Sequence, residues 1–136
     1  MKAAALTSLL ALGVVLAGCG RDDGTYDSSC AAPPRGFMTA KDGVGHLRML
    51  LSVEVSPDGS LKWAGAKVDD RTLASYANQA GEWNPEPQVV LEIASLAPCK
   101  RVEEVRAIML FSRICKVSRL CSEGRNPKTW PEVGEP

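Results

Sequence analysis

The chain has 136 residues, with 16 basic and 16 acidic side chains, a formal net charge of zero and five cysteines. This length favours one small domain. Interspersed charges and only 5% aromatic residues argue against nucleic-acid binding, which needs a basic face and stacking aromatics. No apolar run reaches the roughly 20 residues of a membrane-spanning helix.

Residues 1–18 predict a bacterial lipoprotein signal peptide. Lys2 precedes an uncharged, Leu- and Ala-rich core. The core ends in Leu16-Ala17-Gly18-Cys19, which looks like a lipobox, where the cysteine thiol takes the lipid and small residues precede the cut. An ordinary cleaved signal followed by a chance cysteine is the alternative. Cys19 is therefore the predicted lipidation site, and its two or three palmitate-like acyl chains would anchor the mature protein stably.

The same segment predicts the compartment. Gly20 follows the cysteine, where an Asp would act as an inner-membrane retention signal in enteric bacteria. We expect the protein on the periplasmic side of the outer membrane, with the inner membrane less favoured. The periplasm is oxidising, so the four remaining cysteines are expected to form disulfides, the alternative being four reduced, buried thiols. They are Cys30, Cys99, Cys115 and Cys121.

Segments rich in Gly, Pro and polar residues, which interrupt regular secondary structure, divide the mature chain into three parts. Residues 19–45 are a predicted tether, whose middle is pinned to the domain by Cys30. Residues 46–122 form the predicted domain, and residues 123–136, rich in Gly, Pro and charge, a mobile tail.

Hydrophobic periodicity within the domain predicts four strands and two helices. The strands are expected at 46–55, 60–64, 89–94 and 117–121. The helices are expected at 71–80, with Asp69 or Asp70 as the N-cap, and at 101–112, with Glu103, Glu104 and Arg106 on a solvated face.

The element order ββαβαβ defines an α+β fold, a four-stranded mixed sheet with two helices on one face. The strands at 89 and 117 belong to a βαβ unit and should be parallel. The predicted pairing of the cysteines follows, because Cys99 and Cys121 would then lie at the same end of two neighbouring strands. Cys30 would pair with Cys115, since an extended span from Cys115 to Cys121 would hold those two apart.

The pattern resembles the periplasmic domain of the ExbD/TolR family over about residues 51–120. A hairpin turns at Asp58-Gly59 and leads to Gly65 and a helix. An apolar strand, Val89-Val90-Leu91-Glu92-Ile93-Ala94, precedes a helix with Val102 and Val105.

The sequence departs from the family pattern, and the first departure concerns the family's proton-driven motor, which depends on an Asp in an N-terminal membrane helix. The apolar N-terminal segment carries no Asp, Ser95 replaces the Asp that usually follows the third strand, and Ile114-Cys115 replaces a Gly. The resemblance implies a periplasmic module that contacts an envelope protein or peptidoglycan and self-associates as a homodimer, without motor activity. The alternative is a structural or inhibitory envelope lipoprotein of unrelated α+β fold.

Few residues suggest a catalytic, metal-binding or partner-binding role. His46 is the only histidine, and we expect it on the surface at the start of a strand. Asp69 and Asp70 suit helix capping or a metal. Trp63 shares a strand face with Leu61 and is expected in the core, whereas Trp83 lies in a Gly/Pro loop and is the candidate residue for contact with a partner or glycan. We expect no enzyme activity, cofactor, metal or nucleic-acid partner.

Overall fold

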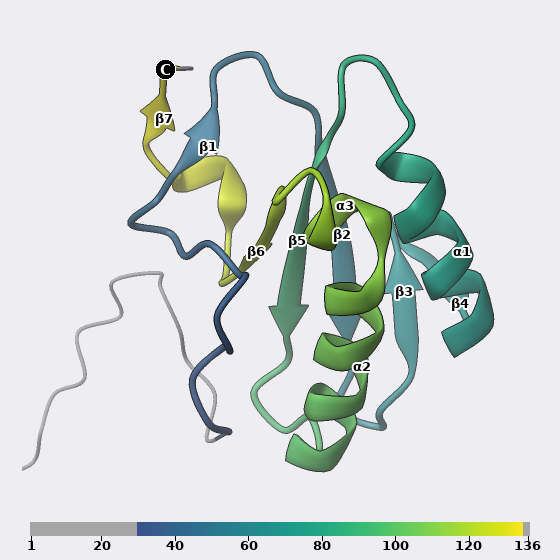
Figure 1. The fold of residues 1–136 in the computed structure, drawn as a ribbon. Coiled ribbons are helices and arrows are strands. Elements are labelled where there is room, and N and C mark those ends of the chain that lie inside the picture. The colour runs from purple at the N-terminus through teal and green to yellow at the C-terminus, as the bar shows by residue number, and fades with distance from the viewer. Residues whose placement is uncertain (1–29, 135–136) are drawn as a thin grey trace, which may run out of the picture.

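The computed structural model describes residues 30–134; the signal peptide, Cys19 and the first part of the predicted tether lie outside them. No helix within this range is long and apolar enough to cross a membrane. The helices and strands, shown in Figure 1, are β1 (Val44–Gly45), β2 (Leu50–Val55), β3 (Leu61–Trp63), β4 (Ala66–Val68), α1 (Asp70–Ala80), β5 (Gln88–Ile93), α2 (Cys99–Phe111), α3 (Arg113–Lys116), β6 (Cys121–Glu123), the 3-10 helix η1 (Pro127–Thr129) and β7 (Glu132–Val133).

The central sheet has five strands in the order β4-β3-β2-β5-β6. β3 is antiparallel to β2 and β4, whereas β5 is parallel to β2 and β6. The predicted α+β class and mixed sheet are confirmed, but the predicted count of four strands is wrong. The chain turns a second time at Ala64 and Gly65, which both have positive φ (47° and 86°), and β4 returns along β3.

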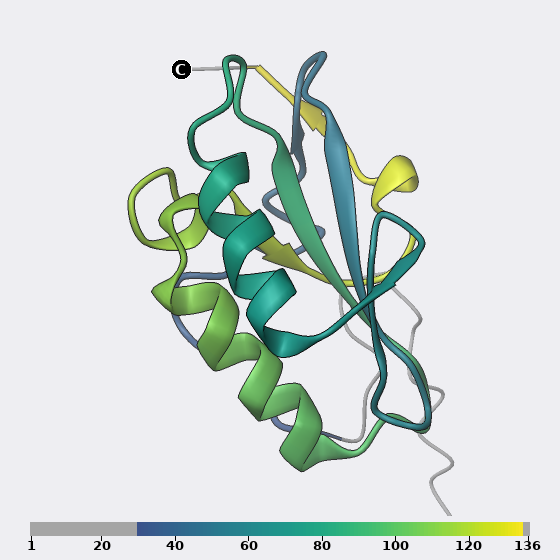
Figure 2. The same cartoon turned by 90° about the vertical axis from the view of Figure 1, so that its right-hand side faces the viewer.

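Helices α1 and α2 cover one face of this sheet, as predicted (Figure 2). The core between them is built by alternate strand residues, because successive side chains of a strand point to opposite faces. Val53 and Leu91 from the sheet and Leu73 and Val105 from the helices have no exposed surface. The short helix α3, which was not predicted, adds the fully buried Ile114 to this core.

A second, smaller core lies on the opposite face of the sheet, and it joins the two ends of the described chain. Val90 of β5 packs there with Ala40, Val44 and Trp130. The amide of the buried Gln88 donates to the Gly43 carbonyl (3.0 Å) and to Ser122 Oγ (2.7 Å).

The predicted domain limits of 46 and 122 are therefore too narrow. β1 and β7, which come from the predicted tether and the predicted mobile tail, pair in parallel, and η1 lies between β6 and β7. The apolar residues of these two segments are too widely spaced in the sequence to show a hydrophobic period. Only the contact between the segments in the folded chain shows that they belong to the domain.

Two strands begin later than the periodicity predicted. Leu47 has a φ of 56° and is 88% exposed, so β2 starts at Leu50 rather than at 46. The last strand was predicted at 117–121 but lies at Cys121–Glu123. Residues 117–120 instead form a tight turn between α3 and β6. In this turn Arg119 has a φ of 57°, and the Leu120 N–H donates to the Ile114 carbonyl (3.0 Å).

The four cysteines form two disulfides, as expected, but both predicted pairings are wrong. The bonds join Cys30 to Cys99 and Cys115 to Cys121, with Cα separations of 5.2 and 5.0 Å. Cys121 begins β6 instead of ending it and is paired with Val89, so it lies at the opposite end of the strands from Cys99. The turn after α3 brings Cys115 and Cys121 together, where an extended strand would have separated them. The expectation that Cys30 pins the tether is confirmed.

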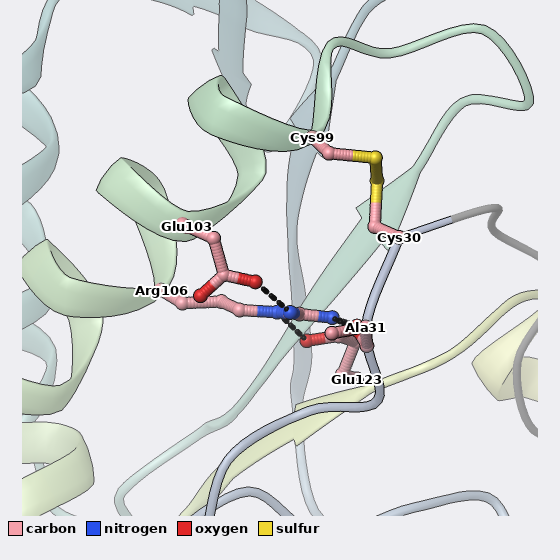
Figure 3. The surroundings of a disulfide bond; sticks show 6 residues. All are labelled: Cys30, Ala31, Cys99, Glu103, Arg106 and Glu123. Atoms are coloured by element: carbon pink, nitrogen blue, oxygen red, sulfur yellow. Dashed lines mark hydrogen bonds and ion pairs between the residues drawn. A yellow bond between two sulfur atoms is a disulfide. The ribbon is translucent and has the colours of Figure 1, made fainter.

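A buried ion pair adds a further link beside the first disulfide (Figure 3). Arg106 was predicted on a solvated face, which is wrong: its side chain and that of Glu123 are each 1% exposed. The guanidinium donates to both Glu123 carboxylate oxygens (2.9 and 2.6 Å), to Glu103 Oε1 (2.6 Å) and to the Ala31 carbonyl (2.8 Å). Arg106 therefore ties α2 to β6 and to the segment that enters the fold after Cys30.

Candidate binding site around Trp83

Three aromatic side chains and one amide line a small open pocket at the C-terminal end of α1. Its volume is about 170 Å³, and Trp63, Tyr76, Gln79 and Trp83 form its walls. Trp63 is the last residue of β3, Tyr76 and Gln79 lie three residues apart on α1, and Trp83 follows in the loop to β5. We call these four residues the Trp83 pocket.

The pocket has a buried base and exposed sides. Trp63 is 9% exposed, as its predicted place in the core requires, whereas Tyr76 and Trp83 are 40% and 46% exposed. The rings of Trp63 and Tyr76 pack with their centroids 5.7 Å apart at an interplanar angle of 59°, within the range of favourable aromatic pairs. The side chain of Tyr76 is thereby held against a fixed support while part of it still faces solvent.

The loop that carries Trp83 is fixed at both ends by arginines. Arg113 Nε donates to the Gly81 carbonyl (3.0 Å), and its backbone N–H donates to Asn78 Oδ1 (2.8 Å). Arg48 Nη1 donates to the Glu86 carbonyl (2.9 Å) at the other end. These bonds hold Trp83 in place beside α1, so a ligand would meet a largely formed surface.

Gly81 permits this close approach. A Cβ atom built at Gly81 would lie 2.7 Å from Arg113 Cγ and 2.9 Å from the Ile114 nitrogen. Since the latter is a backbone atom, a larger residue would separate α1 from α3. Gly81 directly follows the predicted helix at 71–80, but the sequence pattern indicated neither this contact nor the part that Tyr76 and Gln79 play in the pocket. The three-residue spacing of Tyr76 and Gln79 on one helix was the available signal.

The chemistry of the pocket suits an apolar or amphipathic ligand. Its walls carry no charged side chain. Gln79 Nε2 donates to Ser75 Oγ (2.9 Å), and this bond orients the amide. Flat aromatic faces beside an oriented amide can contact a sugar ring or the apolar side chain of a protein.

The other candidate residues have structural surroundings. Asp69 is the N-cap of α1: its Oδ1 accepts from the Thr72 N–H (2.7 Å). Arg101 pairs with Asp70, and this hydrogen bond lowers the pKa of Asp70. His46 Nδ1 lies 2.8 Å from Glu132 Oε2 on the surface. Within residues 30–134, no three His, Cys, Asp or Glu side chains are grouped as metal ligands would be.

A wider groove lies between η1 and the two neighbouring central strands β2 and β5. It has a volume of about 530 Å³, and its charged side chains are Glu92 and Lys128. Burial raises the pKa of Glu92, and the neighbouring Glu54 raises it further, while a backbone hydrogen bond from Asn126 opposes the shift. The hydrophobic period placed Glu92 in a strand without a role, because the C-terminal residues that line the groove with it begin at Asn126, 34 residues later in the chain.

No protein-family model, curated protein or solved structure matches the chain. The likeness to the ExbD/TolR family therefore stays a prediction from the sequence.

Proposed function

We propose that the protein is a lipid-anchored, non-enzymatic periplasmic binding module of the ExbD/TolR type that contacts peptidoglycan or an envelope protein through the Trp83 pocket. One observation carries this proposal: Trp83 and Tyr76 stay substantially exposed although their surroundings are fixed by Trp63, Arg113 and Arg48. Aromatic side chains held in this way are typical of residues that dominate binding energy at interfaces.

The size of the pocket limits what enters it. Small-molecule sites usually have volumes of about 300–1,000 Å³. The Trp83 pocket, at about 170 Å³, has room for one sugar ring or one side chain. The ligand should therefore be a polymer of which one unit enters the pocket, which both a glycan strand and a protein surface can supply.

The remaining parts of the proposal come from the sequence and from two features of the fold. The lipobox ending in Cys19 supports acylation and a place at the outer membrane. Two disulfides within one small domain are typical of exported proteins. Within residues 30–134, β4 pairs only with β3, and its free edge supports the expected self-association.

Binding to sacculi and to solubilised envelope proteins tests the site. The mature chain is incubated with purified sacculi, and separately used as bait for solubilised envelope, as wild type and as Trp83→Ala. We expect Trp83→Ala to weaken one of the two interactions by about 30-fold or more, the loss typical of a central aromatic residue. Leu96→Ala is the matched control, because Leu96 is 81% exposed and does not line the pocket. Equal binding by the Trp83→Ala and Leu96→Ala variants would show that the pocket is not the site.

Acylation is tested separately by labelling cells with a fatty-acid probe. We expect label on the wild type and none on Cys19→Ser. An unlabelled wild type, or a labelled Cys19→Ser protein, would rule out the proposed anchor.

A further inference from the structure

The end of α2, α3 and the turn after it form an unusually basic stretch. Residues 105–122 contain four arginine or lysine side chains and no acidic residue. Two of them have structural partners: Arg106 in the buried pair with Glu123 and Arg113 at the Gly81 carbonyl. Lys116 and Arg119 are instead exposed at the surface.

These two cations share a groove with a third. The groove has a volume of about 510 Å³, and Arg35, Lys116 and Arg119 are its charged side chains. Gly36, whose φ of 105° favours glycine, brings the entering chain close to α2, since a Cβ there would lie 3.0 Å from Leu110 Cδ2. The groove therefore forms where the segment after Cys30 crosses the end of α2.

The positive charge of this groove is not neutralised within the described part of the chain. Every salt bridge formed among residues 30–134 involves other side chains, so none places a carboxylate within 4 Å of Arg35, Lys116 or Arg119. The groove walls add Phe37, Met38 and Leu110 and no acidic residue. A phosphate group would meet cations in this groove and an acyl chain would meet apolar side chains.

Two large apolar residues that directly follow lining residues of this groove in the sequence are exposed to solvent. Phe111, which follows Leu110, is 81% exposed, and Val117, which follows Lys116, is 62% exposed. Exposed apolar residues interleaved with Lys and Arg are typical of surfaces that lie in the headgroup region of a membrane. We call Arg35, Lys116, Arg119, Phe111 and Val117 the basic patch.

We propose that the basic patch docks the domain on a bilayer surface that contains anionic phospholipids. The cations would contact lipid phosphates, and Phe111 and Val117 would enter the headgroup boundary. This chemistry is independent of the Trp83 pocket, and it rests on the proposed lipid anchor only for bringing the domain to the membrane.

The length of the chain before the fold is compatible with this orientation. Cys30 is fixed to Cys99 at the start of α2, and α2 has 13 residues, so its far end is about 20 Å away. Eleven residues lead from Cys19 to Cys30, which span at most about 36–40 Å when extended. A lipid on Cys19 can therefore enter the same membrane that the basic patch touches.

Vesicle binding by the mature chain without its lipid tests the proposal. The chain of residues 19–136 carrying Cys19→Ser contains the whole described fold, and its binding to vesicles does not depend on acylation or on peptidoglycan. It is sedimented with vesicles of phosphatidylcholine alone or of phosphatidylcholine with phosphatidylglycerol. We expect binding to the anionic vesicles, weakened by high salt because exposed charges are screened.

Matched variants locate the surface. Each basic residue near an anionic membrane contributes about fivefold to partitioning, so Lys116→Gln/Arg119→Gln should lower it by roughly 30-fold. Lys67→Gln/Arg71→Gln removes the same two charges from exposed positions on β4 and α1 and should change partitioning by less than about twofold. Phe111→Ser should weaken binding by about tenfold.

Three outcomes would overturn the proposal. The first is that the unlipidated chain does not bind anionic vesicles, and the second is that it binds neutral vesicles equally well. The third is that the two double variants lose binding equally. The substituted positions are exposed, so circular dichroism is expected to show unchanged folding in each variant.

Discussion

The two disulfides close loops of very different length, which predicts unequal contributions to stability. Cys30 and Cys99 are 69 residues apart in sequence, and Cys115 and Cys121 are 6 apart. A cross-link restricts the unfolded chain more as its loop grows, and the chain-entropy relation gives about 4 kcal/mol for the long loop and about 2 kcal/mol for the short one. Each contribution is a substantial fraction of the free energy of unfolding of a typical domain, which is about 5–15 kcal/mol.

The measurement must separate the cross-link from the packing of the sulfur atoms, because Cys121 is fully buried whereas Cys99 is exposed. A variant with Cys115→Ala and Cys121→Ala retains only the long bond, and one with Cys30→Ala and Cys99→Ala retains only the short bond. Each variant is unfolded in urea when oxidised and when reduced. The difference within one variant reports the bond alone, since no side chain is otherwise replaced.

We expect reduction to lower the free energy of unfolding by about 2 kcal/mol more in the variant that retains the long bond. Equal losses in the two variants, or a larger loss from the short bond, would refute the argument from loop length. Peptide mapping without reduction checks the pairing itself, because a Cys99–Cys121 peptide would contradict the strand positions described above.

Three further outcomes follow from particular contacts. Arg106→Met should lower the free energy of unfolding by about 3–5 kcal/mol, because it leaves Glu123 buried without its partner, and adding Glu123→Leu should restore much of the loss; equal losses in the single and double variants would contradict this reading of the pair. Gly81→Ala should cost about 1–3 kcal/mol in urea unfolding through its contact with α3, whereas Gly134→Ala, with nothing within 4 Å, should cost almost nothing. Burial raises the pKa of Glu92 above its ordinary value of 4.5, so its stabilising contribution is complete below that pH and is lost as the pH rises through the folded-state pKa; Glu92→Gln should therefore be more stable than the wild type at pH 7 but not at pH 4, and a constant difference across this range would refute it.

The sequence alone determined the elements whose residues follow a regular period or a local signal. The helix at 71–80 was predicted within one residue of α1, because Asp69 caps it and Leu73, Ala77 and Ala80 repeat along one face. The strand at 89–94 was predicted within one residue of β5, whose apolar run is buried on both faces. Such signals act over a few residues, so no knowledge of the distant chain is needed.

The sequence alone predicted only one residue of the candidate binding site. Trp83 stood out because a large aromatic residue in a Gly/Pro loop has no core to enter, and it is indeed exposed. That Tyr76, Gln79 and Trp63 join it depends on how α1 lies on β3, which is a matter of tertiary packing. The basic stretch at 105–122 was likewise present in the sequence. Which of its cations have structural partners depends on tertiary contacts, because Arg106 pairs with Glu123 of β6 and Arg113 binds the Gly81 carbonyl after α1.

Only the tertiary structure decided the ends of the domain and the pairing of its cysteines. Val44 and Trp130 are 86 residues apart and become core residues only because both pack on Val90. A shift of the last strand by four residues, from 117 to 121, moved Cys121 to the other end of the sheet and exchanged both disulfide partners. A disulfide forms only where two Cα atoms come within about 7 Å, and that distance is set by the packing of whole elements rather than by the residues beside each cysteine.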